Sequence, residues 1–420
     1  MIEAAKKQAA AMAVERAARE SYGRLVAYLA ARTGDVAGAE DALAEAFASA
    51  LGQWPADGVP ANPAAWLLTV ARRKRIDALR RAQPGAMQLE HLKLMTQEMA
   101  DGIEAAAAAP DDIPDRRLAL MFACAHPAIE PAIRTPLILQ AVLGLTAADI
   151  AAAFLVPPAT MGQRLVRAKA RIREAGIAFA IPASDEWPGR LDAVLETVYA
   201  AYAKGWVEAG EAGPPALAGE AIWLGRVIVH LLPDEPEAKG MLAPMLHAEA
   251  RRPARRDAAG AYVPLDAQDA GLWDRGLIDE AERLLAEANA GGPSGRYQIE
   301  AAIQSAHAAR LLFGVANRDA VAALYDLLAI LAPSPVVTLN RAMARAEIDG
   351  SAAALAAIAP LSADRRMADY QPYWAARGHL CAAAGQRDAA YEALTLAIGL
   401  TADPAVRRYL QQQRDRLRNG

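Results

Sequence analysis

The sequence predicts an almost entirely α-helical protein. Ala, Leu, Arg and Glu dominate its 420 residues, aromatic residues make up only 5%, and alternating β-branched residues are nearly absent. The dominant residues are mostly good helix formers, and apolar side chains recur at helical spacing along most of the chain. A chain of this length is expected to form two or three domains, each with its own core.

The stretch from Leu143 to Glu174 predicts two short helices joined by a tight turn. The first is expected over 147–153, with Thr146 capping its N-terminus through the hydroxyl. The second is expected to begin near Pro158, because proline is favoured in a first helical turn. One face of this second helix is apolar, and the other carries five basic residues between 164 and 173 and no acid. The pattern is typical of a helix-turn-helix whose second helix lies in a DNA major groove; an ordinary helical hairpin with a solvated basic face is the alternative.

The first part of the chain predicts three more helices. Two amphipathic helices are expected between 14 and 51, with a break near 32–35, and the second of them carries acidic residues. A loop rich in turn formers spans 55–63, and a helix over 65–81 follows it. That helix carries six basic residues against one acid, Asp77. Two separated basic helices suit a protein that contacts a DNA duplex at two places.

The order of these modules resembles the sigma-70 family of RNA polymerase sigma factors, of the extracytoplasmic-function type. GAEDALAEAF is similar to region 2.2, NPAAWLLTVARRKRIDALRR to regions 2.3 and 2.4, and LTAADIAAAFLVPPATMGQRLVRAKARIR to region 4.2. Four further phrases resemble the subgroup with a long helical C-terminal extension: DIPDRRLALMFACAHPAI, FLVPPATMGQRLVRAKARIREAGI, LDAQDAGLWDRGLIDEA and YQIEAAIQSAHA. Met161-Gly162-Gln163 departs from the family pattern at the place where the bases of the −35 element are read.

The resemblance implies two partners, core RNA polymerase and promoter DNA, and a set of residues for each. Region 2.2 would dock on the polymerase through Glu40, Asp41, Glu45 and Phe47. The −10 element would be held and read by Asn62, Trp66, Arg72, Arg73, Lys74, Arg75, Arg80 and Arg81. The −35 element would be read by Thr160, Met161, Gln163, Arg164, Arg167 and Lys169. The arginines of the first basic helix would mainly contact phosphates.

The resulting domain organisation has four parts. Residues 1–85 are expected to form sigma region 2, and 113–181 the helix-turn-helix of region 4. The segment between them, 86–112, reads as an acidic linker with few apolar residues. Residues 182–420 are expected to form a helical domain, with a tetratricopeptide-like repeat over 335–420 because Gly350 and Gly385 lie 35 residues apart.

The balance of charge differs between residues 1–180 and residues 181–420 and suggests that the two parts have different functions. The net charge of −4 for the whole chain argues against nucleic acid, but residues 1–180 carry 21 Lys and Arg against 19 Asp and Glu, whereas residues 181–420 carry 24 against 30. Local clusters matter more for DNA binding than the total. The acidic C-terminal domain is therefore expected to regulate activity in cis, by contacting the sigma modules or another protein.

Several function classes find no support in the sequence. No phosphate-binding glycine loop, catalytic triad or metal cluster is present, so we expect no enzyme and no cofactor. Cys124 and His126 have no second pair of ligands nearby, and a buried thiol is the better interpretation. No apolar run reaches the length of a membrane span, and two cysteines are too few for a disulfide framework, so a cytoplasmic protein without membrane contact is expected. The alternative function is a helical-repeat adaptor whose N-terminal modules bind protein rather than DNA.

Overall fold

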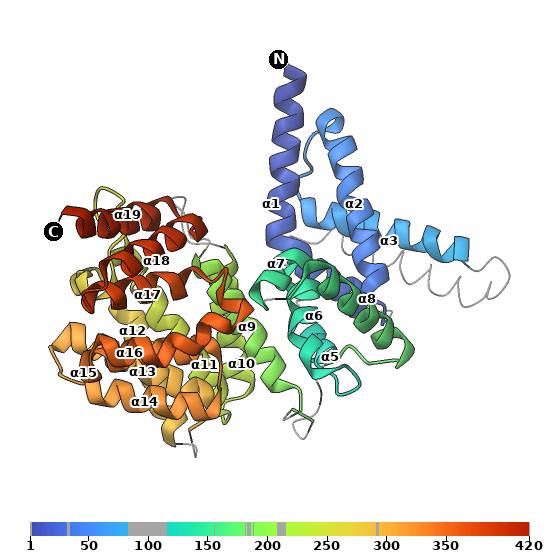
Figure 1. Cartoon of the computed structure of the whole chain (residues 1–420). Coiled ribbons are helices and arrows are strands. Elements are labelled where there is room, and N and C mark those ends of the chain that lie inside the picture. The colour runs from blue at the N-terminus through green and yellow to red at the C-terminus, as the bar shows by residue number, and fades with distance from the viewer. Residues whose placement is uncertain are drawn as a thin grey trace. The chain divides into compact units, whose positions relative to one another are not determined.

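The computed structural model describes residues 2–31, 34–82, 116–154, 156–180, 182, 186–187, 189–207, 216–290 and 294–419. Within these ranges the chain is all-α, as predicted (Figure 1). Extended pairing in the same ranges amounts to one isolated antiparallel bridge, between Arg256 and Tyr262. None of the described helices combines the length and hydropathy that a membrane span requires. The predicted acidic linker, 86–112, lies outside the described residues.

The chain divides into two compact units, and the division falls inside one helix. The first unit comprises Met1–Ala209 with Pro214–Ala221, and the second comprises Gly210–Gly213 with Ile222–Gly420. The first unit therefore extends beyond the boundary expected at residue 181. The reason is α9 (Leu191–Val207), which packs on α6 (Pro131–Leu143) in the first unit.

Three helices open the first unit: α1 (Ile2–Ala31), α2 (Val36–Asp57) and α3 (Pro63–Ala82). They pack against one another around fully buried leucines that include Leu25, Leu43 and Leu67. Side chains in the two connections fix the helix starts. Asp35 Oδ1 accepts a hydrogen bond from Gly38 N at 3.1 Å, and Asn62 Oδ1 accepts one from Ala65 N at 3.0 Å. Each bond satisfies an amide that the first turn of a helix leaves unpaired.

The helix-turn-helix forms as the sequence predicts. Two short helices, α5 (Arg117–Cys124) and α6, precede α7 (Ala147–Ala153) and α8 (Pro158–Glu174). Thr146 caps α7, because its hydroxyl oxygen accepts a hydrogen bond from Asp149 N at 3.1 Å. Asp149 in turn accepts hydrogen bonds from the amide and the hydroxyl of Thr146. This reciprocal cap fixes where α7 begins.

The second unit is a succession of helices. The helices are α10 (Ala216–Leu231), which begins in the first unit, α11 (Pro236–Ala250), α12 (Arg275–Ala290), α13 (Arg296–Phe313), α14 (Arg318–Leu331), α15 (Pro335–Asp349), α16 (Ser351–Ile358), α17 (Gln371–Ala383), α18 (Arg387–Leu400) and α19 (Pro404–Asn419). From α14 to α19 each helix packs mainly against its neighbours in chain order, whereas α13 packs chiefly on α11. The stretch α14–α19 has the neighbour-by-neighbour packing that is typical of a helical solenoid.

The helix pair α17–α18 shows the contacts that its sequence predicts. Ala390, Leu394 and Ala397 are buried at the contact. Gly378 faces Leu394 so closely that a Cβ at Gly378 would lie 2.8 Å from Leu394 Cγ. Gly385 closes the turn between the helices with a φ of +76°, a conformation that favours glycine. The repeat spacing therefore located a real helical hairpin.

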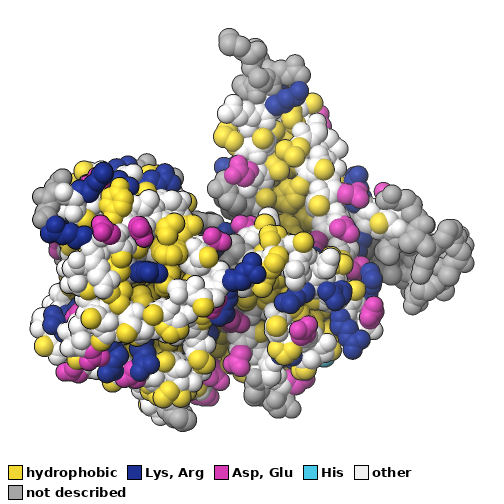
Figure 2. Space-filling view, in the orientation of Figure 1, with side chains coloured by type: hydrophobic (Ala, Val, Ile, Leu, Met, Phe, Trp, Pro, Cys, Tyr) yellow, Lys and Arg dark blue, Asp and Glu magenta, His cyan; other side chains and the backbone are white. Residues whose placement is uncertain are grey.

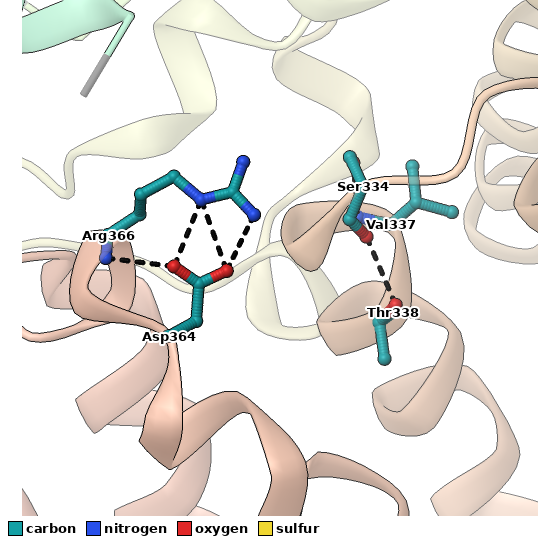
Figure 3. A network of polar contacts seen from close by, with 5 residues as sticks. All are labelled: Ser334, Val337, Thr338, Asp364 and Arg366. Carbon is teal, nitrogen blue, oxygen red and sulfur yellow. Dashed lines mark hydrogen bonds and ion pairs between the residues drawn. The ribbon is translucent and has the colours of Figure 1, made fainter. Parts of the chain in front are cut away.

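Short-range polar contacts fix the ends of helices in this unit (Figure 3). Ser334 begins α15, with Oγ accepting from Val337 N at 3.1 Å and its carbonyl accepting from the Thr338 hydroxyl at 3.0 Å. Asp364 caps the 3₁₀ turn Arg365–Met367 by accepting from Arg366 N at 2.9 Å. The guanidinium of Arg366 folds back on the same carboxylate, with Nη2 at 2.6 Å from Oδ2. These caps fix the start of α15 and of the 3₁₀ turn at Arg365.

Candidate nucleic-acid interface

Helix α8 separates an apolar face from a basic face. Met161, Leu165, Ala168 and Ile172 are buried in the core. Five hydrophilic residues at intervening positions are exposed, together with Val166; the five are Gln163, Arg164, Arg167, Arg171 and Arg173. Neither Arg164 nor Arg171 makes an ion pair within the described part of the chain. These cations are therefore available to an external ligand.

Three of the α8 arginines line a groove. Arg164, Arg167 and Arg171 form one wall, and Ile129, Glu130 and Ile133, at the start of α6, form the other. The groove has a volume of about 470 Å³. Figure 2 shows dark blue basic side chains gathered over α8. A row of guanidinium groups along a helix can bind successive phosphates or donate to guanine edges.

The start of α7 is held by polar contacts that reach another helix. Asp149 Oδ1 lies 3.4 Å from Lys204 Nζ of α9. The hydrogen bond from the Thr146 hydroxyl, with help from Lys204, lowers the pKa of the Asp149 carboxyl below its usual value. Asp149 is therefore ionised at neutral pH, and its cap on α7 is fully formed. The cap and the ion pair fix α7, on which α8 packs.

The residues predicted to read the −35 element fall into three groups. Gln163, Arg164 and Arg167 are exposed on the groove side of α8 or next to it, and Thr160 is half-buried. Met161 is only 2% exposed, so its side chain belongs to the core in this structure, and its contact with DNA stays a prediction. Lys169 forms an ion pair with Glu40 of α2, so in this state it is engaged within the protein. Arg171 was missed, although it follows Arg164 and Arg167 at helical spacing.

Several basic side chains of α3, the first basic helix, make contacts within the protein. Arg72 is only 9% exposed, donates to the Tyr28 hydroxyl at 3.0 Å and lies over the Tyr28 ring at 5.2 Å. Arg75 donates to the Leu29 carbonyl at 3.2 Å. Arg72 therefore bridges α3 to α1 in this structure, and its contact with DNA phosphates stays a prediction. Lys74 lies 3.5 Å from Glu45, and Arg73 is exposed. The side chains of Arg80 and Arg81 lie outside the described residues.

The loop before α3 borders a second basic cavity, of about 500 Å³. Asn62 lines it and also caps α3, while Trp66 lies behind the loop in edge-to-face contact with Trp54, with 5.4 Å between ring centroids. Arg16, Arg24 and Arg117 contribute three cations to the cavity, and Glu220 forms an ion pair with Arg117. The sequence reasoning missed these arginines because they come from α1 and α5, far from the loop in the chain.

The predicted polymerase-binding residues lie on α2 in different environments. Asp41 and Glu45 are exposed, and Phe47 is half-buried. Glu40 is largely buried beneath its ion pair with Lys169, and burial raises the pKa of its carboxyl even though Lys169 opposes the shift. The predicted polymerase-binding face of α2 is therefore only partly exposed in this structure.

The described residues contain no group of three or more His, Cys, Asp or Glu side chains placed to hold a metal ion. Cys124 is a fully buried free thiol, and burial raises its pKa. His126 Nδ1 accepts a hydrogen bond from Ala128 N at 3.1 Å, which closes the turn after α5. Both side chains therefore have structural roles here.

Comparison with known proteins identifies two parts of the chain. Residues 18–84 match the model for sigma-70 region 2, and residues 190–289 match a family of unknown function (DUF6596). The chain is also similar to "Uncharacterized protein R00370" of Rhizobium meliloti (strain 1021), with 38% identity over 413 residues that cover 97% of this chain and 95% of that protein. No solved structure matches the chain. The chain therefore belongs to one family with R00370 over nearly its whole length, and its residues 18–84 are a sigma-70 region 2 domain.

Proposed function

We propose that this chain is an alternative sigma factor of the extracytoplasmic-function type, which binds core RNA polymerase and directs it to promoters. The observation that carries the proposal is the helix-turn-helix whose α8 presents Arg164, Arg167 and Arg171 along one groove. It follows a sigma-70 region 2 domain in the same chain. A region 2 domain and a basic helix-turn-helix in this order are what recognition of two promoter elements requires.

Each module has a part in this function. The α2 face, with Glu40, Asp41, Glu45 and Phe47, docks on core polymerase. The loop at Asn62, with Trp66 and the exposed Arg73, holds the −10 element, and the cavity beside Asn62 offers arginines to the backbone of the opened strand. Helix α8 contacts the −35 element. The protein acts in the cytoplasm, where its polymerase is, and has no catalytic chemistry of its own.

The helical second unit is assigned a regulatory role in cis. Its acidic net charge and its tetratricopeptide-like hairpin α17–α18 support binding to a basic or helical partner surface. The same features favour the second candidate, an adaptor that binds only proteins. The exposed arginines of α8 count against the adaptor, because a protein-only scaffold does not need an unpaired cationic row along one groove.

Reconstituted transcription tests the proposal. Purified chain and core polymerase are combined on promoter fragments selected from transcript starts mapped after overexpression. Specific initiation that depends on the chain is the expected result, and binding to core polymerase should survive removal of DNA. Initiation should fall when Arg164, Arg167 and Arg171 are replaced by alanine, while Arg173→Ala, outside the groove, serves as the matched control. A chain that binds no core polymerase is not a sigma factor.

A further inference from the structure

We propose that the second unit contains a binding site for a free amino acid with an apolar side chain. The site is a cavity of about 210 Å³ formed by α13, α14, α15 and the 3₁₀ turn Leu265–Ala267. All four segments belong to the second unit, and α14 packs on both α13 and α15 (Figure 1). The inference goes beyond the proposed function, because it holds whether or not the chain binds polymerase.

The cavity suits a small molecule that is partly apolar. Five of its lining residues are apolar or aromatic: Val321 is buried, and Leu265, Tyr325, Met343 and Ala344 are half-buried. Its volume equals that of about seven water molecules at about 30 Å³ each, and it is smaller than the about 300–1,000 Å³ of pockets for drug-sized ligands. A single compact molecule with a short apolar part therefore fits inside it.

The charged residues of the cavity are balanced, with two cations against two carboxylates. Glu347 of α15 lies between the two arginines: its Oε2 is 2.7 Å from Arg318 Nε, and its Oε1 is 3.5 Å from Arg310 Nη1. Arg310 also forms an ion pair with Asp266. A ligand with a single charge would meet a like charge as well as an opposite one, whereas a zwitterion finds a partner for each of its ends.

The polar groups of the cavity are able to exchange their present contacts for a ligand. The side chains of Asp266 and Arg318 are 70% and 64% exposed, and ion pairs as exposed as these contribute little to stability. Among the described residues, Arg310 Nε is buried without a hydrogen-bond partner, and the side chain of Asn340 forms no hydrogen bond. A carboxylate binds a guanidinium through parallel N–H groups, and an ammonium group needs oxygen acceptors. The ligand carboxylate therefore lies at Arg310 and Arg318, and its ammonium group at Glu347.

Two further titratable side chains line the cavity without adding charge. Burial and the nearby Arg310 lower the pKa of His307, and burial raises the pKa of Tyr325 to about 12. Both side chains are uncharged at neutral pH. The two arginines and the two carboxylates alone therefore set the charge balance that favours a zwitterion.

Isothermal titration calorimetry of the full-length chain tests the site. Valine, leucine, isoleucine and methionine are titrated separately, without polymerase or DNA. At least one of them should bind at one site per chain with a Kd below about 1 mM. The N-acetyl derivative of the tightest binder lacks the ammonium charge, and its amide lacks the carboxylate. Each derivative should bind at least about tenfold more weakly than the free amino acid, a loss of about 1.4 kcal/mol.

Two substitutions locate the binding in the cavity. Arg318→Gln removes a cation, and Ala344→Leu fills part of the space; each should weaken binding at least about tenfold. Arg341→Gln is the matched control, because Arg341 Nε lies 2.6 Å from Asp326 Oδ1 in an ion pair that also joins α14 to α15 but lies outside the cavity. It should change the affinity less than about twofold, since distant sites act independently. Circular dichroism checks that every variant is folded.

Three outcomes would overturn the proposal. The first is that none of the four amino acids binds. The second is that the N-acetyl derivative or the amide binds as tightly as the free amino acid, because the ligand would then not be recognised as a zwitterion. The third is an unchanged affinity in both Arg318→Gln and Ala344→Leu, or an equal loss in Arg341→Gln, because binding would then not depend on the cavity.

Discussion

Helices α3 and α8 are both strongly basic in sequence, but the structure uses their charges differently. On α3, Arg72 is buried against Tyr28 and Arg75 binds the Leu29 carbonyl, so these cations join helices of the region 2 domain. On α8, Arg164, Arg167 and Arg171 line an open groove. A count of basic residues cannot separate these cases, because it ignores which face of the helix each cation occupies.

The difference follows from the phase of each cation relative to the apolar stripe. Arg72 comes four residues after Leu68, which is 1% exposed, so it lies on the packed face of α3. Arg164 and Arg171 directly precede the buried residues Leu165 and Ile172. Consecutive residues are about 100° apart around a helix, so the two arginines lie at the edge of the apolar stripe of α8, beside the groove. The same chemical group is structural on one helix and available on the other. Four predictions, each with its own substitutions, test the roles of α3 and α8.

The largest effect is expected for the groove of α8. Replacing Arg164, Arg167 and Arg171 together by alanine should weaken promoter DNA binding at least about 100-fold, since each contact to a base is worth about 1–3 kcal/mol and phosphate contacts add to it. The slope of log affinity against log salt should fall by about three. Fluorescence anisotropy at several salt concentrations measures both quantities. An equal loss for Arg173→Ala would mean that the effect comes from net charge and not from the groove.

The apolar side of α8 should respond in stability and not in DNA contact. Met161→Ala should lower the free energy of unfolding of the first unit by about 2–5 kcal/mol, because it removes a buried side chain from the core. Val166→Ala, at a position 68% exposed, should change stability by less than about 0.5 kcal/mol. Urea unfolding followed by circular dichroism compares the two. If Met161→Ala weakens DNA binding while stability is unchanged, Met161 is a contact residue after all.

Arg72 and Arg73 are adjacent on α3, but their substitutions should have different effects: one on stability, the other on DNA binding. Arg72→Met removes the hydrogen bond and the cation–π contact to Tyr28 and should cost about 1–2 kcal/mol of stability. Arg73→Met should leave stability nearly unchanged and weaken DNA binding modestly. Thermal unfolding and anisotropy on the same samples check both expectations. A stability loss for Arg73→Met as large as that for Arg72→Met would remove the distinction between the two positions.

Sequence patterns predicted the helices of this chain far better than the roles of their polar residues. The bounds of α7 and α8 followed from local signals, Thr146 at one helix start and Pro158 at the other, because capping and proline chemistry act within a few residues. The Glu40–Lys169 ion pair joins residues 129 positions apart, and no local pattern encodes such a contact. The contact of Arg72 with Tyr28 could not be predicted for the same reason, since Tyr28 comes from another helix.

The smallest effect is expected at Gly162, where the chain departs from the family pattern of region 4.2. A Cβ at this position would meet nothing within 4 Å, so Gly162→Ala should add helix propensity without a clash and stabilise the first unit by about 0.5–1 kcal/mol. DNA affinity should stay the same or rise slightly, because α8 loses less entropy on binding. Reduced affinity in a more stable protein would show instead that the backbone of α8 approaches DNA closely at Gly162. Gly162 would then be part of promoter recognition, because the backbone of α8 at this position would contact DNA alongside the basic side chains.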